Sequence, residues 1–171
     1  DLFKSLGKQK ELSDVYDQVA YLYENIEEYD KAIEYFQASL ALKKQLGFQE
    51  QALIVQEHIA VCQEVVRDVK EAILNYEYLL GVYKAKDKFS DKTENLLVKL
   101  SALAELQDNW EKGKLYNTEL LRLYFQKQDY KEIVVGLNNL GVLEKKNKNV
   151  KEADLYFKQA ETFADSIGRS V

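Results

Sequence analysis

The stretch NNLGVLEKKNKNVKEADLYFKQAE, residues 138–161, decides the fold of this chain. Gly141, Ala153 and Ala160 are small residues in a run that is otherwise rich in charged, helix-forming side chains, and the aromatic Phe157 stands between the last two. Small residues let two helix backbones approach closely, and larger neighbours fill the space beside them. We therefore interpret the stretch as two helices that cross at Gly141 and Ala153, with Phe157 wedged at the crossing.

The same pattern occurs four times along the chain, with a period of about 40 residues. KSLG ends at Gly7, KQLG ends at Gly47 and DSIG ends at Gly168. The four repeats defined in this way are 8–47, 48–87, 88–128 and 129–168. The aligned columns are Ala20, Ala60, Ser101 and Gly141; Ala32, Ala72, Gly113 and Ala153; Phe36, Tyr76, Asn117 and Phe157; and Ser39, Leu79, Leu120 and Ala160. A period of this size indicates an array of identical structural units.

Each repeat is predicted to be a pair of amphipathic helices joined by a tight turn. The expected pairs are 9–25 and 29–46, 49–66 and 69–86, 92–107 and 110–127, and 130–146 and 150–167. The fold class is therefore all-α, an α-solenoid of four antiparallel helix pairs in which each pair packs on the next.

Composition agrees with this interpretation. The 171 residues are 46% hydrophobic and 31% charged, they contain no proline and only seven glycines, and these proportions are typical of a folded helical protein. A net charge of −5 would repel a phosphate backbone, so we expect no nucleic acid partner. No run approaches the roughly 18 apolar residues of a transmembrane helix, so we expect no membrane insertion.

Four segments resemble the second helix of the tetratricopeptide repeat: YDKAIEYFQASL, VKEAILNYEYLL, WEKGKLYNTELL and VKEADLYFKQAE. NNLG before Gly141 resembles part of its first helix. The resemblance covers nearly the whole chain and is weakest in the third repeat, where Asn117 and Leu120 replace the usual aromatic and small residue. The period is about 40 rather than 34. This length is similar to members found in kinesin light chains, spindle-orientation adaptors, peptide-sensing bacterial phosphatases and sensory arms of bacterial regulators.

The resemblance implies a right-handed solenoid whose first helices line a concave groove that holds another protein or a peptide. The polar column in that groove would be Gln18, His58, Lys99 and Asn139, and its neighbours are unexpectedly apolar. The predicted partner-binding residues are Gln18, His58, Val61, Val65, Lys99, Ala102, Leu106, Asn138, Asn139 and Val142. A flanking helix or a second copy of the chain would cover such an apolar surface equally well. The carboxylate clamp of some family members is not expected, because Asp17 and Glu57 put acid where that mode needs Lys and Asn.

His58 is the one histidine of the chain and Cys62 is its one cysteine. They stand four residues apart, but two ligands are too few for a metal site. Cys62 aligns with the apolar residues Leu22, Leu103 and Leu143, so we expect a buried cysteine that reacts slowly with thiol reagents. No phosphate-binding glycine loop, HExxH motif or nucleophile turn is present, and we expect no catalytic residues and no cofactor.

Two functions remain open from the sequence. The first is a protein-interaction scaffold, in a bacterial signal-transduction protein. The second is the ligand-sensing arm of a multidomain kinase or phosphatase whose catalytic domain lies outside this sequence. DLFKSLG resembles the end of a preceding helix, so residues 1–171 are expected to be one repeat domain cut from a longer chain. The isolated domain is then expected to self-associate through its exposed end faces. A single cysteine suits a reducing compartment or a periplasm, which leaves localisation open.

Overall fold

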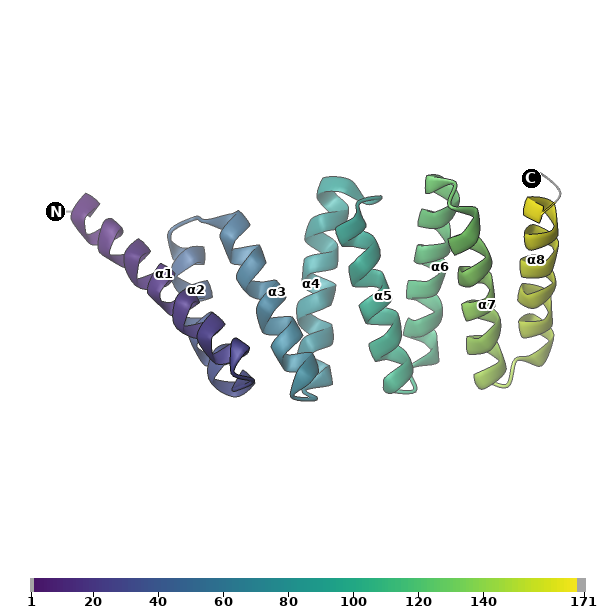
Figure 1. Ribbon diagram of the computed structural model, residues 1–171, viewed down its shortest axis with the longest axis horizontal. Coiled ribbons are helices and arrows are strands. Elements are labelled where there is room, and N and C mark those ends of the chain that lie inside the picture. Colours follow the sequence, from purple (N-terminus) through teal and green to yellow (C-terminus); the bar gives the residue numbers. More distant parts are fainter. Residues whose placement is uncertain (1, 169–171) are drawn as a thin grey trace. The chain divides into compact units, whose positions relative to one another are not determined.

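The computed structural model describes the backbone of residues 2–168 and the side chains of residues 7–166. In this part of the chain the secondary structure is eight α-helices (Figure 1). They are α1 (Leu2–Asn25), α2 (Tyr29–Gln45), α3 (Gln49–Val65), α4 (Val69–Asp87), α5 (Asp91–Leu106), α6 (Trp110–Lys127), α7 (Tyr130–Lys146) and α8 (Val150–Gly168). The prediction of four helix pairs is confirmed, and every helix boundary but one lies within a residue of its predicted place.

The exception is the start of α1, which was expected at residue 9 and lies at Leu2. The prediction took Gly7 as the end of a preceding helix, and this was wrong. A glycine ends a helix when it adopts a left-handed conformation, as Gly47 does after α2 with a φ of 75°. Gly7 lies inside α1 instead, because one glycine costs a helix only about 0.5–1 kcal/mol.

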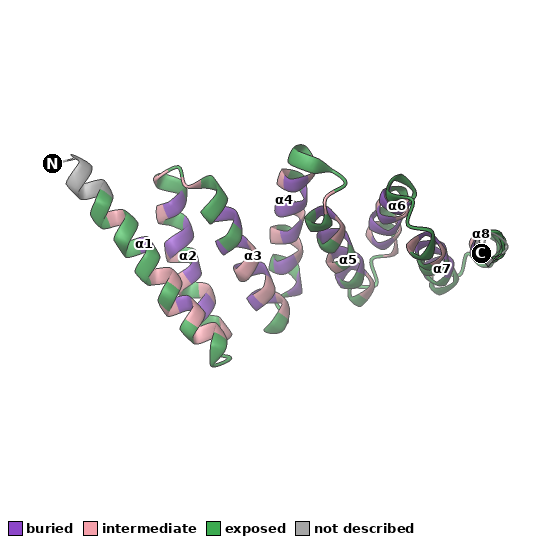
Figure 2. Ribbon diagram, turned by 45° about the horizontal axis from the view of Figure 1, so that its top comes forward, coloured by how far each residue is buried: buried purple, intermediate pink, exposed green. Residues whose placement is uncertain are grey.

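The chain forms two compact units, residues 1–79 and residues 80–171, whose boundary falls within α4. In the N-terminal unit α1 packs on α2 and α2 packs on α3. In the C-terminal unit α5, α6, α7 and α8 pack on one another in chain order. Within each unit the buried residues form stripes along the helices, with exposed residues on the remaining faces (Figure 2).

The turn inside each repeat has one backbone geometry. Glu27, Arg67, Asp108 and Lys148 have φ values of 62°, 66°, 52° and 64°. Next to each of them an amide closes the preceding helix, as in the bond from the Asn149 N–H to the Glu144 carbonyl at 2.8 Å. This pairing satisfies carbonyls that the end of a helix would otherwise leave unbonded. The recurrence of one turn at the repeat period supports the assignment of the four repeats.

The small-residue columns are buried, as predicted. Ala20, Ala32, Ala60 and Ala72 have no exposed surface, and Ala153 is 1% exposed. Cys62 is also fully buried, which confirms the prediction for this residue. Its aligned residue Leu22 is 64% exposed, because the described residues place no further helix against that side of α1. Alignment to a buried column therefore predicts burial only where a neighbouring helix is present.

Gly141 lies against the ring of Phe157, as the opening stretch predicted. A Cβ atom added to Gly141 would lie 2.6 Å from Cε1 of that ring and less than 3 Å from two further ring carbons. Such distances are shorter than van der Waals contact, so α7 and α8 require glycine at this position. Gly113 has a similar role, because its Cβ would lie 2.9 Å from Cδ1 of Leu143.

Replacing Gly141 with alanine is therefore expected to lower the free energy of unfolding by up to about 2 kcal/mol. Overpacking costs about 1–3 kcal/mol, and the higher helix propensity of alanine offsets about 1 kcal/mol of it. Gly81 in α4 is the matched control, since an added Cβ there meets no atom within 4 Å. Gly81→Ala should raise stability by about 0.5–1 kcal/mol. Urea denaturation would measure both changes, and equal signs would contradict the packing at Gly141.

Candidate partner-binding surface

In the C-terminal unit predicted binding residues lie on exposed faces of α5 and α7. Leu106 of α5 is 55% exposed and Val142 of α7 is 44% exposed. Val98 of α5, which was not among the predicted residues, is 47% exposed. The Lys146 ammonium pairs with the Glu105 carboxylate at 2.8 Å and links the two helices beside these residues. We call this surface the α5/α7 face. Its residues are Val98, Ala102, Leu106, Val135, Asn138, Asn139 and Val142.

The polar residues on and beside the α5/α7 face differ in whether their side chains are available to a partner. The side chains of Asn138 and Asn139 are exposed and lie next to each other on α7. Lys99 was predicted on the same surface, but it is half-buried and already interacts within the protein. Val135 was not among the predicted residues; it is 46% exposed and lies one helical turn before Asn139. Its spacing of four from Asn139 is a periodic signal that could have identified it.

In the N-terminal unit the predicted residues do not form a comparable free surface. Gln18 is exposed, Val65 is 48% exposed and Val61 is half-buried. The side chain of His58 is 33% exposed, and its Nδ1 atom lies 3.0 Å from a carboxylate oxygen of Glu24. The histidine is therefore held by its own unit, which the sequence analysis did not anticipate.

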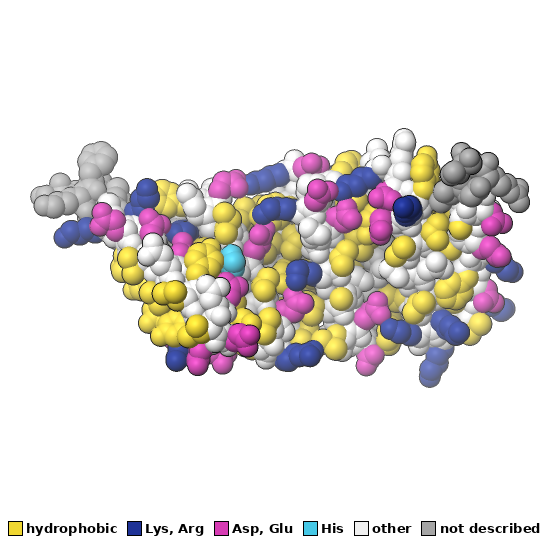
Figure 3. All heavy atoms as spheres, in the orientation of Figure 1, with side chains coloured by type: hydrophobic (Ala, Val, Ile, Leu, Met, Phe, Trp, Pro, Cys, Tyr) yellow, Lys and Arg dark blue, Asp and Glu magenta, His cyan; other side chains and the backbone are white. Residues whose placement is uncertain are grey.

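Aromatic rings also hold His58 in place. Its ring stacks on Phe36 of α2 with a centroid distance of 5.2 Å and an interplanar angle of 24°. Tyr21 of α1 meets it edge-on at 4.8 Å. His58 of α3 therefore contacts both α1 and α2, and it packs where the three helices meet. The histidine of the chain is visible beside acidic side chains in Figure 3 (cyan).

Asp17, which the sequence analysis placed one position before Gln18, also bonds within the N-terminal unit. It accepts a hydrogen bond from the Ser39 hydroxyl and pairs with the Lys43 ammonium at 2.8 Å. The side chain of Lys43 is 3% exposed, and a buried ammonium is stable only when it is paired. Asp17 therefore holds α1 to α2, and the α5/α7 face remains the stronger candidate site.

The described residues contain no cluster of three or more His, Cys, Asp or Glu side chains that could hold a metal ion. Burial, together with the negative charge of Glu24, raises the pKa of the Cys62 thiol to about 12. The thiol is therefore protonated at neutral pH, and this disfavours reaction as a nucleophile. No helix in the described part of the chain has the length and apolarity needed to cross a bilayer.

Residues 13–46 match the family model of the tetratricopeptide repeat. Solved structures of similar fold include BtubC (BKLC) from P. vanneervenii, with a TM-score of 0.68 and 18% identity over 92% of this chain. RapI in its apo form has a TM-score of 0.66 and 15% identity over 92% of this chain. Aspartyl phosphate phosphatase F from Bacillus subtilis has a TM-score of 0.63 and 10% identity over 94%.

This chain spans only part of each of those proteins, 65% of BtubC, 44% of RapI and 42% of the phosphatase. No curated protein matches the sequence. At these identities the similarity to the solved structures concerns the fold of the helix array.

Proposed function

We propose that this chain is a tetratricopeptide-repeat protein and a protein-binding scaffold, whose α5/α7 face holds a segment of a partner protein. The match of residues 13–46 to the family model and the similar fold of BtubC support the proposal. The observation that carries the proposal is the exposure of Val98, Leu106 and Val142 around two adjacent asparagines. Apolar side chains grouped on a surface mark interaction sites. No nucleic acid, membrane or cofactor is needed for this function.

The chemistry of the α5/α7 face suits a polypeptide. Each asparagine side chain has two N–H donors and a carbonyl acceptor, which match the backbone groups of a peptide. The valines and Leu106 offer apolar contacts to the side chains of the same segment. A partner would therefore be recognised by its backbone and by a few apolar residues.

Replacing Asn139 with alanine should weaken partner binding by about 1–3 kcal/mol, because a hydrogen bond that becomes buried in the complex is lost. The free energy of unfolding should change by less than about 0.5 kcal/mol, because the side chain is exposed. Binding can be measured by calorimetry with a peptide selected from a random library on the wild-type protein. Gln37→Ala on α2, also exposed, is the control and should bind that peptide normally.

Two outcomes would contradict this assignment. Lost stability with unchanged peptide affinity would mean that Asn139 packs internally. A dimer of the wild-type chain that Leu106→Glu dissociates would mean that a second copy covers the α5/α7 face, and ultracentrifugation would detect it.

We also propose that the scaffold serves signal transduction. Support comes from the fold similarity to RapI and to an aspartyl phosphate phosphatase. In this role the partner would be a protein that carries an aspartyl phosphate. Calorimetry with the phosphorylated and unphosphorylated forms of such a protein tests the idea, and the absence of binding to both forms would refute it.

A further inference from the structure

A residue near the end of one second helix faces a residue of the next second helix at three places, and a hollow lies beside the second and third of these pairs. Lys44, Lys84 and Phe125 each stand twelve residues after a small residue of the second helix, at Ala32, Ala72 and Gly113. Tyr78, Glu119 and Gln159 each stand six residues after Ala72, Gly113 and Ala153. The three facing pairs are therefore Lys44 and Tyr78, Lys84 and Glu119, and Phe125 and Gln159.

The first two pairs bridge their helices. In the N-terminal unit the Lys44 ammonium lies 5.7 Å from the centroid of the Tyr78 ring and 3.4 Å from the Gln56 side-chain oxygen. In the C-terminal unit the Lys84 ammonium pairs with the Glu119 carboxylate at 2.6 Å. A charged side chain thus joins the two second helices in each of these pairs.

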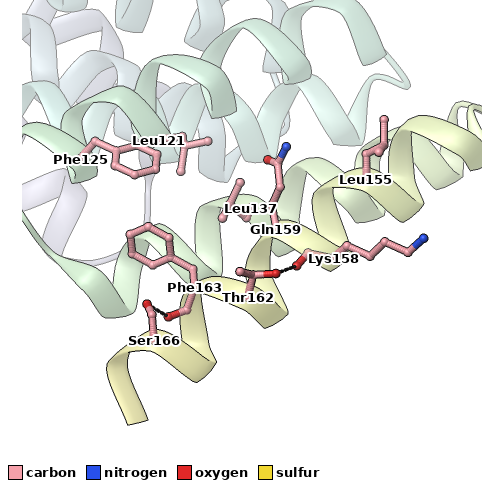
Figure 4. Close-up of a pocket in the computed structure, with 9 residues that line it drawn as sticks. All are labelled: Leu121, Phe125, Leu137, Leu155, Lys158, Gln159, Thr162, Phe163 and Ser166. Atoms are coloured by element: carbon pink, nitrogen blue, oxygen red, sulfur yellow. Dashed lines mark hydrogen bonds between the residues drawn. The ribbon is translucent and has the colours of Figure 1, made fainter. Parts of the chain in front are cut away.

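The third pair, on α6 and α8, has no such bridge. Phe125 contacts Phe163 of α8 instead, with the rings edge to face and their centroids 5.6 Å apart. A cavity of about 520 Å³ remains, bordered by these two rings and by Leu121, Leu137 and Leu155 (Figure 4). Phe125 is 48% exposed and Leu155 is 57% exposed, so the cavity opens to the outside. We call it the α6/α8 groove.

We propose that the α6/α8 groove is a second docking site, for a helical segment of a partner protein that inserts bulky apolar side chains and places a carboxylate beside Lys158. Within the C-terminal unit this site lies between the second helices α6 and α8, with Leu137 of α7 at its border, whereas the α5/α7 face lies on first helices. The proposal goes beyond the scaffold function, because it assigns a separate surface and a separate partner chemistry.

Charge identifies the acidic component of the partner. Lys158 is the single charged side chain among the residues that line the groove, and it is exposed at the end near Leu155 (Figure 4). Among the described residues no carboxylate pairs with it. Lys84 beside the neighbouring groove has such a partner in Glu119. A carboxylate from another molecule would pair with the Lys158 ammonium, as the Glu119 carboxylate of the protein itself pairs with Lys84.

The shape of the groove indicates a helix as the occupant. Leu155 and Phe163 are eight residues apart on α8, a rise of about 12 Å, which an amphipathic helix spans with apolar residues at i, i+4 and i+7. Aromatic and leucine side chains at the floor and walls provide the apolar contacts that anchor such helices.

The test uses a variant that closes the groove by copying the neighbouring one. Phe125→Lys together with Gln159→Glu reproduces the Lys84 and Glu119 pair at exposed positions. The control is Leu115→Gln, because Leu115 of α6 is 55% exposed but does not line the groove. Circular dichroism verifies folding, and Leu155→Gln replaces the closing variant if the latter does not fold.

The probes are two labelled alanine-based helical peptides with leucines at i, i+4 and i+7, one with a glutamate beside the last leucine and one with a lysine there. Fluorescence anisotropy should show that the glutamate peptide binds the wild type at least tenfold more tightly than the lysine peptide does. The closing variant should bind the glutamate peptide at least tenfold more weakly than the wild type does. Lys158→Gln should bind the two peptides with equal affinity. Leu115→Gln and Asn139→Ala should bind both peptides with the affinity of the wild type.

Equal affinity of the wild type and the closing variant for the glutamate peptide would overturn the proposal. It would also be overturned if Leu115→Gln lost as much affinity for this peptide as the closing variant does. Anilinonaphthalene sulfonate, an aromatic anion, is the third probe. If the wild type binds this dye, the closing variant does not, and neither peptide binds, the groove is a site for small amphipathic anions and the partner helix is refuted. The binding of the α5/α7 peptide is unaffected by any of these results, which separates this test from that of the scaffold function.

Discussion

Replacing Phe36 with alanine is expected to lower the free energy of unfolding by about 3–5 kcal/mol. Phe36 has no exposed surface, and its ring meets the Tyr21 ring edge-on at 5.1 Å and stacks on His58. Its removal therefore opens a cavity where three helices of the N-terminal unit meet. Urea denaturation followed by circular dichroism measures the loss.

Phe157→Ala is the matched control, because Phe157 holds the same position in the fourth repeat but is only half-buried. Its loss should cost about 1–2 kcal/mol, since less apolar surface leaves water in the native state. A loss below 1 kcal/mol for Phe36→Ala would contradict the packing of this ring in the core. Equal losses in the two variants would show that the position in the repeat, rather than burial, sets the packing energy.

The residues that pack helix on helix could be predicted from sequence because they recur. Ala32, Ala72, Gly113 and Ala153 must be small at the same crossing in every repeat, so the same constraint appears four times. The turn positions recur for the same reason. A repeat thus gives four observations of one local geometry, and the helix pairs follow from it.

Interactions that occur once could not be predicted in this way. Lys43 occupies a buried position that holds Tyr83 and Tyr124 in the next two repeats, and it is tolerated there because Asp17 neutralises it. Lysine is rarely fully buried, so its sequence gives no signal of burial. The contact between His58 and Glu24 joins residues 34 positions apart and is equally invisible. Part of the predicted polar column was therefore already engaged within its own unit.

The α6/α8 groove is an intermediate case. Phe125 stands in a column whose other members are Lys44, Lys84 and Asp165, and an aromatic residue in a column of charged residues is a visible departure. The consequence of this departure depends on the residues that face the column, which are Tyr78, Glu119 and Gln159. Which residues face each other is known only from the helix packing. A column that changes residue type in one repeat therefore indicates where the surface of the array differs from repeat to repeat.

The free energy of unfolding is expected to fall by about 3–5 kcal/mol between pH 9 and pH 11. Burial raises the pKa of Cys62 to about 12 and that of Tyr124 to about 12. Burial also raises the pKa of Tyr76, and its hydroxyl donates a hydrogen bond to Glu64 at 2.7 Å. The native state therefore keeps protons that the unfolded state loses, and each such group costs up to about 1.4 kcal/mol per pH unit above its ordinary pKa.

The measurement is urea denaturation at several pH values for the wild type, Cys62→Ala and Tyr124→Phe. Each variant should be less sensitive to high pH than the wild type, whatever its stability at pH 7, because one titrating group is gone. Unchanged slopes in both variants would contradict the assignment of these protons. Cys62 lies in the N-terminal unit and Tyr124 in the C-terminal unit. If the units unfold in one cooperative step, both variants flatten the same transition, and if they unfold separately, each variant flattens only the transition of its own unit.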